Sequence, residues 1–248
     1  MRRVNLWSSP RNVSTALMYA FAQRADTRVV DEPLYAAYLA RFPELDHPGR
    51  AEILRSQPTG AEEVIGWMRN GACEREVVVF KQMTHHLTGL PDWSFALEMT
   101  NVLLIRDPRA IIASYSKVIP EPTPQDVGIA LQYELFEFLN KREALQAVLD
   151  ARELLLDPPG VLRQLCGRLG IPFDESMRSW PPGPRPEDGI WARYWYGRLH
   201  RTTGFRPYVE REIALNEQQE ALAAACQDRK STRLNSSHYR TSRMPSSA

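Results

Sequence analysis

Short apolar runs that alternate with helix-like segments constrain the fold of this 248-residue chain more than any other feature. Runs rich in Val, Ile and Leu occupy residues 4–7, 77–80 and 102–105, and each leads into a turn. Continuous apolar runs of this length are typical of parallel strands that are buried on both faces. A helix-like pattern follows each turn, so the sequence predicts an α/β domain with a doubly wound, mostly parallel sheet.

Helical spacing of apolar residues gives the remaining expected elements. Helices are predicted over residues 14–24, 108–117, 125–148 and 159–169. The last of these opens with two prolines and closes at Gly170, which are common boundary residues of a helix. The interruptions at residues 43–59 and 181–188 are expected to be surface loops.

Composition places the chain among ordinary globular domains. Hydrophobic residues make up 43% of it, which is enough for the core of one domain over residues 1–227. No segment has the ~20 uninterrupted apolar residues of a membrane span or the apolar stretch of a signal peptide, so we expect a cytoplasmic protein without a membrane partner. The three cysteines, Cys73, Cys166 and Cys226, are too few and too far apart for a disulfide framework or a Cys-x-x-Cys site.

Residues 228–248 differ abruptly from the rest of the chain. They contain six Ser, five basic residues and one acid, which is a composition typical of a disordered tail. The segment also resembles the in-frame translation of a DNA-sequencing adapter, so we expect it to be non-native and the native chain to continue past Gln227. Without this segment, 26 basic and 29 acidic residues remain, a balance that does not favour a nucleic-acid partner.

A polar loop joins the first predicted strand to the first predicted helix. Arg11 lies in this loop, and Ser14 and Thr15 open the helix. Unpaired N–H groups and the positive end of the helix dipole suit this position to phosphate or sulfate. In the alternative interpretation, Ser14 only caps the helix and Arg11 faces solvent. The loop lacks the Gly-x-x-x-x-Gly-Lys pattern of nucleoside-triphosphate sites.

A second anion-binding element follows the strand at residues 102–105. Arg106 comes at its carboxyl end, where open α/β sheets bind ligands. Ser114 lies about two helical turns further on, so its hydroxyl can face the same edge. The two side chains could grip a phosphate together, whereas the ordinary alternative is a surface Arg-Asp pair and an unrelated serine.

These blocks resemble the P-loop sulfotransferases. The likeness rests on the Ser-x-Pro-Arg-x-x-Ser-Thr loop, the Arg-Asp-Pro-Arg-x-x-x-x-Ser block and the stretch at residues 150–173, and it covers about residues 3–180. It implies a P-loop nucleotide-binding fold that uses 3′-phosphoadenosine 5′-phosphosulfate without a metal. The implied ligands of the 5′-phosphosulfate are Arg11, Asn12, Val13, Ser14 and Thr15, and those of the 3′-phosphate are Arg106 and Ser114.

Sulfuryl transfer needs a base for the acceptor. Glu32 follows a short apolar strand, at the place where bacterial sulfotransferases resembling this loop have a glutamate base. His85 and His86 resemble the segment that carries the histidine base of the cytosolic branch. Arg11 favours Glu32, because the cytosolic branch has a lysine at that position whereas a bacterial branch has arginine. The cytosolic branch also has a carboxyl-terminal Arg-Lys-Gly segment that this sequence lacks.

The expected function is therefore transfer of a sulfuryl group to a hydroxyl or amine of a small-molecule or carbohydrate acceptor. The sequence does not identify the acceptor, and it leaves a homo-oligomer open. The alternatives are a phosphotransferase that uses a nucleoside triphosphate and a nucleotide-binding regulatory module. The module stays open because some relatives of this type are joined to aminotransferase-like domains.

An aromatic and basic cluster at residues 189–201 has two interpretations. Trp191, Tyr194 and Trp195 recur at helical spacing, which favours packing in the core. In the functional alternative, one ring stacks on a nucleotide base while Arg193 or Arg198 reaches a phosphate.

Overall fold

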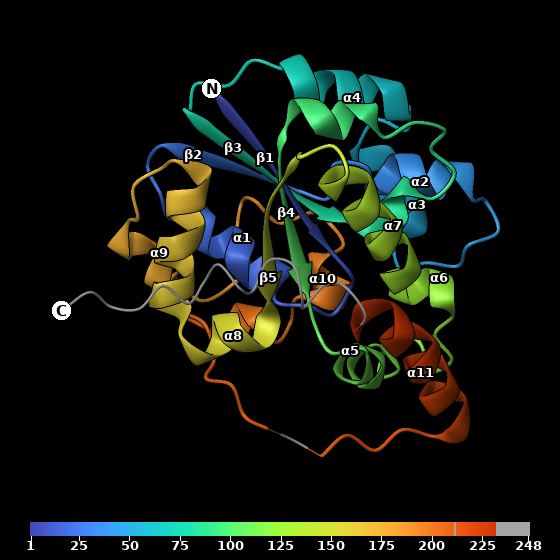
Figure 1. Cartoon of the computed structure of the whole chain (residues 1–248). Coiled ribbons are helices and arrows are strands. Elements are labelled where there is room, and N and C mark those ends of the chain that lie inside the picture. Colours follow the sequence, from blue (N-terminus) through green and yellow to red (C-terminus); the bar gives the residue numbers. More distant parts are fainter. Residues whose placement is uncertain (211, 232–248) are drawn as a thin grey trace.

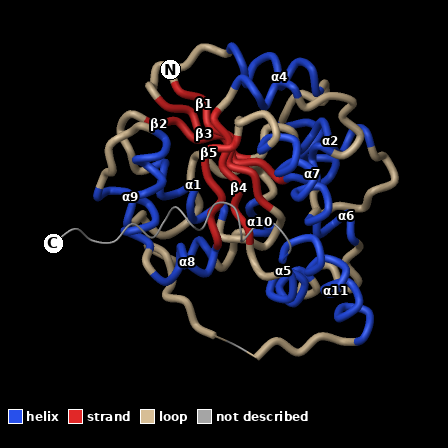
Figure 2. The backbone as a smooth tube through the Cα atoms, viewed as in Figure 1, coloured by secondary structure: helices blue, strands red, loops and turns tan. Residues whose placement is uncertain are grey.

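Five parallel strands form the centre of the molecule (Figures 1 and 2). The computed structural model describes residues 1–210 and 212–231. The strands are β1 (Arg2–Ser8), β2 (Thr27–Asp31), β3 (Val77–Met83), β4 (Thr100–Ile105) and β5 (Leu145–Asp150). They pair in the order β2-β3-β1-β4-β5, and every neighbouring pair is parallel. The carboxyl ends of all five strands therefore lie along one edge of the sheet.

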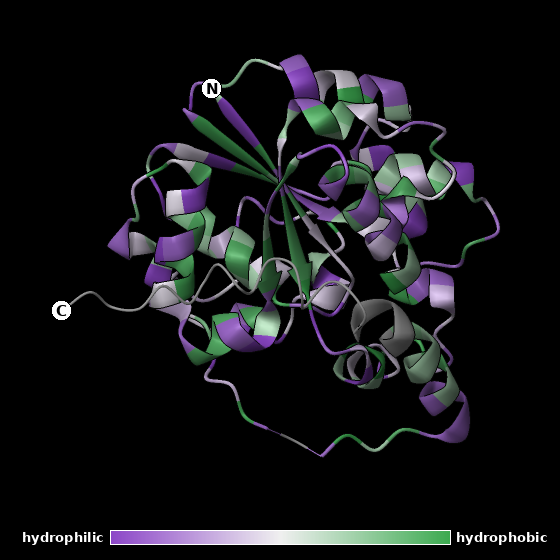
Figure 3. Ribbon diagram, viewed as in Figure 1, coloured by the Kyte–Doolittle hydropathy of each residue, from purple (hydrophilic) through white to green (hydrophobic). Residues whose placement is uncertain are grey.

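Helices cover both faces of this sheet, which confirms the doubly wound architecture. One face packs on α1 (Ser14–Ala22) and α9 (Pro158–Leu169), and the opposite face packs on α4 (Ala61–Asn70) and α7 (Ile129–Asn140). Successive side chains of a strand point to opposite faces, so Leu6 enters the first core and Trp7 the second. Both faces are buried, and β3 and β4 are accordingly hydrophobic along much of their length (Figure 3).

The remaining elements are seven α-helices and four 3-10 turns among the described residues. The α-helices are α2 (Tyr35–Arg41), α3 (Arg50–Ser56), α5 (Pro108–Tyr115), α6 (Pro124–Val127), α8 (Ala151–Leu156), α10 (Ala192–Trp195) and α11 (Glu217–Ser231). The 3-10 turns are η1 (Thr84–Leu87), η2 (Ser94–Glu98), η3 (Glu175–Arg178) and η4 (Leu199–Arg201). Among the described residues, no helix is long and apolar enough to cross a membrane.

The predicted helix over residues 125–148 is wrong in part, because only α6 and α7 within it are helical. Gly128 adopts a left-handed backbone with φ of 66° and separates α6 from α7, and α7 ends at Asn140. Residues 145–150 then form β5 because they pair with β4, so tertiary pairing overrides the local helical pattern. The predicted loop over residues 43–59 is wrong in part. It contains α3, which begins after Gly49 and buries Ile53.

Helix α11 packs against α5 and α7 near the carboxyl edge of the sheet (Figure 1). Ala223 and Cys226 are buried against Ile111 and Ile112. All three cysteines are free, as their spacing predicts. The helix extends to Ser231, whereas residues 232–248 of the predicted non-native segment lie outside the described residues, and the boundary at residue 227 stays a prediction.

Candidate active site

A cleft of about 950 Å³ opens at the carboxyl edge of the sheet. Loops that follow all five strands contribute to its lining, because parallel pairing brings their carboxyl ends together. The cleft gathers every residue that the sequence singled out for the site: Arg11, Asn12, Val13, Ser14, Thr15, Glu32, His85, His86, Arg106 and Ser114. One end of it is rich in guanidinium groups and the other holds a buried carboxylate network.

The loop after β1 presents the N-terminus of α1 to the cleft. Val13 is the N-cap residue, and no side chain caps the helix. The alternative in which Ser14 serves only as the cap is therefore wrong. Asn12 braces the loop instead, since its Nδ2 donates to the Leu104 carbonyl over 3.0 Å and its Oδ1 accepts from the Val13 N–H. The first turn of α1 thus keeps its backbone donors and positive dipole end directed at the cleft.

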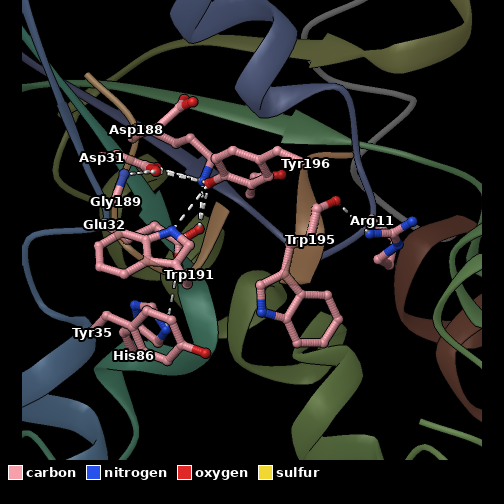
Figure 4. A network of polar contacts seen from close by, with 12 residues as sticks. Arg11, Asp31, Glu32, Tyr35, His86, Asp188, Gly189, Trp191, Trp195 and Tyr196 are labelled. Atoms are coloured by element: carbon pink, nitrogen blue, oxygen red, sulfur yellow. Dashed lines mark hydrogen bonds and ion pairs between the residues drawn. The ribbon is translucent and has the colours of Figure 1, made fainter. Parts of the chain in front are cut away.

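Arg11 is held in place at this end by the neighbouring helix. Its backbone has a positive φ of 56°, which is uncommon for a residue with a side chain. Its Nε donates to Ser114 Oγ over 3.1 Å, and its Nη1 donates to the Trp195 carbonyl over 3.4 Å (Figure 4). Arg106 Nη1 donates to the Arg11 carbonyl, so the two arginines belong to one assembly.

Neither Arg11 nor Arg106 forms an ion pair with a carboxylate of the described residues. Among residues 1–210 and 212–231, no carboxylate lies within 4.0 Å of the guanidinium of Arg11 or Arg106. Burial, reinforced by Arg198, lowers the pKa of Arg11, and burial together with Arg11 lowers the pKa of Arg106. Two partly buried arginines close to each other favour an anionic ligand. The negative charge of that ligand would offset both the burial of the guanidinium groups and the repulsion between them.

Glu32 lies at the other end, directly after β2. It also has a positive φ, of 43°, and its side chain is 8% exposed. Of the three non-glycine residues with positive φ in the described chain, Arg11 and Glu32 line the cleft, and Glu143 lies between α7 and β5. Backbone strain of this kind clusters at functional sites, because the surrounding structure has to maintain it.

A network of hydrogen bonds surrounds the Glu32 carboxylate (Figure 4). Lys81, fully buried on β3, donates from Nζ to Glu32 Oε1 over 2.5 Å and to Asp31 Oδ1 over 2.8 Å. The Tyr196 hydroxyl lies 2.8 Å from Lys81 Nζ and 2.8 Å from Asp31 Oδ2. Burial raises the pKa of Glu32, Asp31 raises it further, and Lys81 opposes both. A raised pKa suits a carboxylate to general base catalysis near neutral pH.

His86 lies beside Glu32 and His85 packs against His86, and burial favours the neutral form of both imidazoles. Burial lowers the pKa of His85 to about 3 and lowers the pKa of His86 well below its usual value. His86 stacks against Tyr35 and Tyr38, with ring centroids 4.6 and 5.1 Å away. Its Nε2 is 3.8 Å from Glu32 Oε2, which is not an ion pair while the imidazole is uncharged. Because both histidines line the cleft and a neutral imidazole can accept a proton, they stay alternatives to Glu32 for the base.

The aromatic cluster divides between core and cleft. Trp191 is 1% exposed and packs in the core, as the packing interpretation predicts. Trp195 instead lines the cleft and stacks on Tyr115, with ring centroids 5.9 Å apart. Arg193 is exposed and pairs with Glu52 over 2.6 Å, whereas Arg198 lines the cleft.

Sequence reasoning missed three residues of the Glu32 network: Asp31, Lys81 and Tyr196. One signal was available, because Lys81 ends an otherwise apolar run in a strand that is buried on both faces. A lysine is almost never fully buried without a partner, so this position calls for a nearby carboxylate.

The fold and the cleft together define an α/β domain with a cleft lined by arginines at the carboxyl edge of a parallel sheet. The family described as the sulfotransferase domain matches residues 1–231, so the chain belongs to this family. Among the described residues, no group of three His, Cys, Asp or Glu is arranged to hold a metal ion.

Solved structures with the same fold include the sulfotransferase domain of the curacin biosynthetic pathway, with a TM-score of 0.55 and 16% identity, covering 90% of this chain and 96% of that domain. A sulfotransferase from Alicyclobacillus acidocaldarius has a TM-score of 0.55 and 14% identity, with 98% and 99% covered. These identities support the fold alone.

Two proteins of Arabidopsis thaliana are closer in sequence. Branched-chain-amino-acid aminotransferase-like protein 1 is 40% identical over 203 residues, and protein 2 is 39% identical over 206 residues. The matches cover 82% and 83% of this chain but 36% of each relative. The chain thus spans about a third of the length of these relatives.

Proposed function

We propose that this domain is a sulfotransferase, which moves a sulfuryl group from 3′-phosphoadenosine 5′-phosphosulfate to a hydroxyl or amine of a small-molecule or carbohydrate acceptor. The observation that carries the proposal is the pairing of two ends in one cleft. Arg11, Arg106 and the N-terminus of α1 form an anion-binding end, and Glu32 supplies a buried carboxylate at the other end. Membership of the sulfotransferase domain family supports the same chemistry.

The residues of the cationic end fit the proposed co-substrate. A phosphosulfate and a separate 3′-phosphate need two positive sites, and Arg11 and Arg106 provide them without an ion pair to any carboxylate of the described residues. Ser114 already accepts a hydrogen bond from Arg11, so its hydroxyl proton is free to donate to a phosphate oxygen. We assign the 5′-phosphosulfate to Arg11 and the α1 N-terminus, and the 3′-phosphate to Arg106 and Ser114.

In the proposed reaction, the acceptor oxygen or nitrogen forms a bond to sulfur as the bond from sulfur to the 5′-phosphate oxygen breaks. Glu32 takes the acceptor proton, and the negative charge that develops on the departing phosphate is stabilised by Arg11 and the N–H groups of α1. The protein contributes position and fixed charge to this transfer. Glu32 is favoured over His85 and His86 because burial raises the pKa of the carboxyl and lowers those of the imidazoles.

Thermal shift with defined nucleotides tests the proposal. Stabilisation by 3′,5′-bisphosphoadenosine, without stabilisation by ATP and magnesium, is the expected result. Stabilisation by ATP alone would support the phosphotransferase, and no stabilisation by either nucleotide would support a module that has lost the site. Arg11→Ala separates binding from catalysis, because we expect it to lower turnover more than nucleotide affinity.

A further inference from the structure

Lys81 has the contacts of a residue that fixes another side chain. Its side chain is completely buried, and its Nζ has three N–H donors. Its three partners are Asp31 Oδ1 at 2.8 Å, Glu32 Oε1 at 2.5 Å and the Tyr196 hydroxyl at 2.8 Å. All three donors are therefore used within the protein, and none remains to bind an acceptor.

Tyr196 and Asp31 complete this arrangement from two other elements. The Tyr196 hydroxyl accepts from Lys81 and from Trp191 Nε1, so its own proton is available to Asp31 Oδ2, 2.8 Å away. The Gly189 N–H donates to the same Asp31 oxygen over 3.2 Å. Asp31 therefore accepts hydrogen bonds from Tyr196 and Gly189, and its other oxygen fixes the position of Lys81 Nζ.

The two oxygens of Glu32 consequently differ. Oε1 accepts from Lys81 and lies 3.3 Å from the Tyr196 hydroxyl. Oε2 accepts no hydrogen bond from the described residues, and the ring nitrogen of His86 is 3.8 Å from it. We propose that Lys81 is a positioning residue, which fixes Oε1 of Glu32 and leaves Oε2 to accept the proton of the acceptor. This inference rests on the proposed function, since it concerns the base of that reaction.

The charges around Glu32 give the proposal a distinctive electrostatic signature. The ionisable groups that face Glu32 are Asp31 on β2, Tyr35 on α2, Lys81 on β3, His86 on η1, Tyr115 on α5 and Tyr196 after α10. Lys81 lowers the pKa of Glu32, and Asp31 raises it. Removing either charge should therefore move the titration of Glu32, and the two removals should move it in opposite directions.

The test is a ¹³C NMR titration of protein labelled at the glutamate carboxyl carbons, with the Glu32 signal identified by its loss in Glu32→Gln. In Lys81→Met we expect the pKa of Glu32 to rise by at least about one pH unit, and in Asp31→Asn we expect it to fall. The matched control is Lys141→Met, the same change at a lysine that is 71% exposed and pairs with Glu137. It should leave the titration of Glu32 unchanged.

An unchanged pKa of Glu32 in folded Lys81→Met would overturn the inference. If Lys81→Met does not fold, Asp31→Asn decides, because the amide keeps an oxygen that can accept from Lys81 while it loses the charge. A Glu32 pKa that stays constant or rises in Asp31→Asn also overturns the inference. The proposed function fails separately, through absence of binding to 3′,5′-bisphosphoadenosine or through full sulfuryl transfer by Glu32→Gln, and the titration needs neither nucleotide nor acceptor.

Discussion

The two ends of the cleft neutralise their buried charges in different ways. At the base end, named for the proposed role of Glu32, Lys81 has two carboxylates and a phenol hydroxyl as partners, so its ammonium group is fully paired without a ligand. At the other end, called the nucleotide end after the proposed co-substrate, Arg11 and Arg106 donate hydrogen bonds only to carbonyls and a hydroxyl among the described residues. We therefore expect the first end to hold a side chain in place and the second to bind an anion.

This difference predicts whether a substitution should lower folding stability or weaken nucleotide binding. Removing one partner from a buried charge network leaves the others uncompensated, at a cost of about 3–5 kcal/mol of folding stability. Removing an arginine that has no carboxylate partner relieves repulsion in the free protein instead, and its cost appears when the nucleotide binds. The predictions below test this division, beginning with the largest expected effect.

The largest effect is expected for Glu32→Gln. The amide preserves the shape of the side chain but cannot take the acceptor proton, so turnover should fall by about 10²–10⁴. Calorimetry should show unchanged affinity for 3′,5′-bisphosphoadenosine, because Glu32 lies at the other end of the cleft. Glu175→Gln, a change at an exposed acid, is the control. Normal turnover by Glu32→Gln combined with loss of turnover in a His85 or His86 variant would assign the base to the histidine segment.

Arg106→Ala should have the next largest effect, and it acts on binding. Loss of a charge-assisted contact should weaken affinity for 3′,5′-bisphosphoadenosine by about 1.5–3 kcal/mol in calorimetry. Arg193→Ala is the control, because Arg193 is an exposed arginine that pairs with Glu52. Wild-type affinity of Arg106→Ala for 3′,5′-bisphosphoadenosine would contradict the assignment of the 3′-phosphate to Arg106.

More residues of the nucleotide end than of the base end could be grouped from the sequence, and the reason is locality. The loop from β1 to α1 is contiguous, and Arg106 and Ser114 are eight residues apart on a strand end and the following helix, so residue spacing alone placed them. The base end joins Glu32 to Lys81 and Tyr196, which are 49 and 164 residues away along the chain. Their contact depends on the pairing of β2 with β3 and on the path of residues 189–196, which local patterns do not encode.

The fold shows the same limit. Parallel strands were predictable where a continuous apolar run is buried on both faces, as in β3 and β4. β5 was missed because most of its residues are only partly buried, and its sequence continues the helical pattern of α7. Pairing with β4 determines its conformation, and the left-handed residue Glu143 turns the chain between the two elements.

The third prediction concerns acid stability at the base end. The pKa of His85 is about 3 in the folded protein and about 6.5 in the unfolded chain, so the unfolded state binds more protons between these values. The free energy of unfolding should therefore decrease as the pH falls from 6.5 toward 3. His85→Asn should remove about 2 kcal/mol of the decrease between pH 7 and pH 5, as measured by urea unfolding at both pH values. An identical pH dependence in wild type and variant would show that His85 is not buried as a neutral group.

The smallest effect is expected for Ser114→Ala, which removes a neutral hydroxyl from the nucleotide end. Its Oγ accepts from Arg11 Nε, so the loss combines one contact to the arginine with one proposed contact to the 3′-phosphate. Each hydrogen bond of this kind contributes about 0.5–1.5 kcal/mol, so affinity for 3′,5′-bisphosphoadenosine should fall several-fold. Ser94→Ala, which changes an exposed serine that bonds Asp92, is the control.

A double-mutant cycle with Arg11→Ala separates the two contributions, because an effect that acts only through Arg11 disappears once that side chain is absent. A remaining loss in the Arg11→Ala background would place the Ser114 hydroxyl on the nucleotide itself. Equal affinity of Arg11→Ala and of the double variant Arg11→Ala/Ser114→Ala would show that Ser114 acts only by holding Arg11.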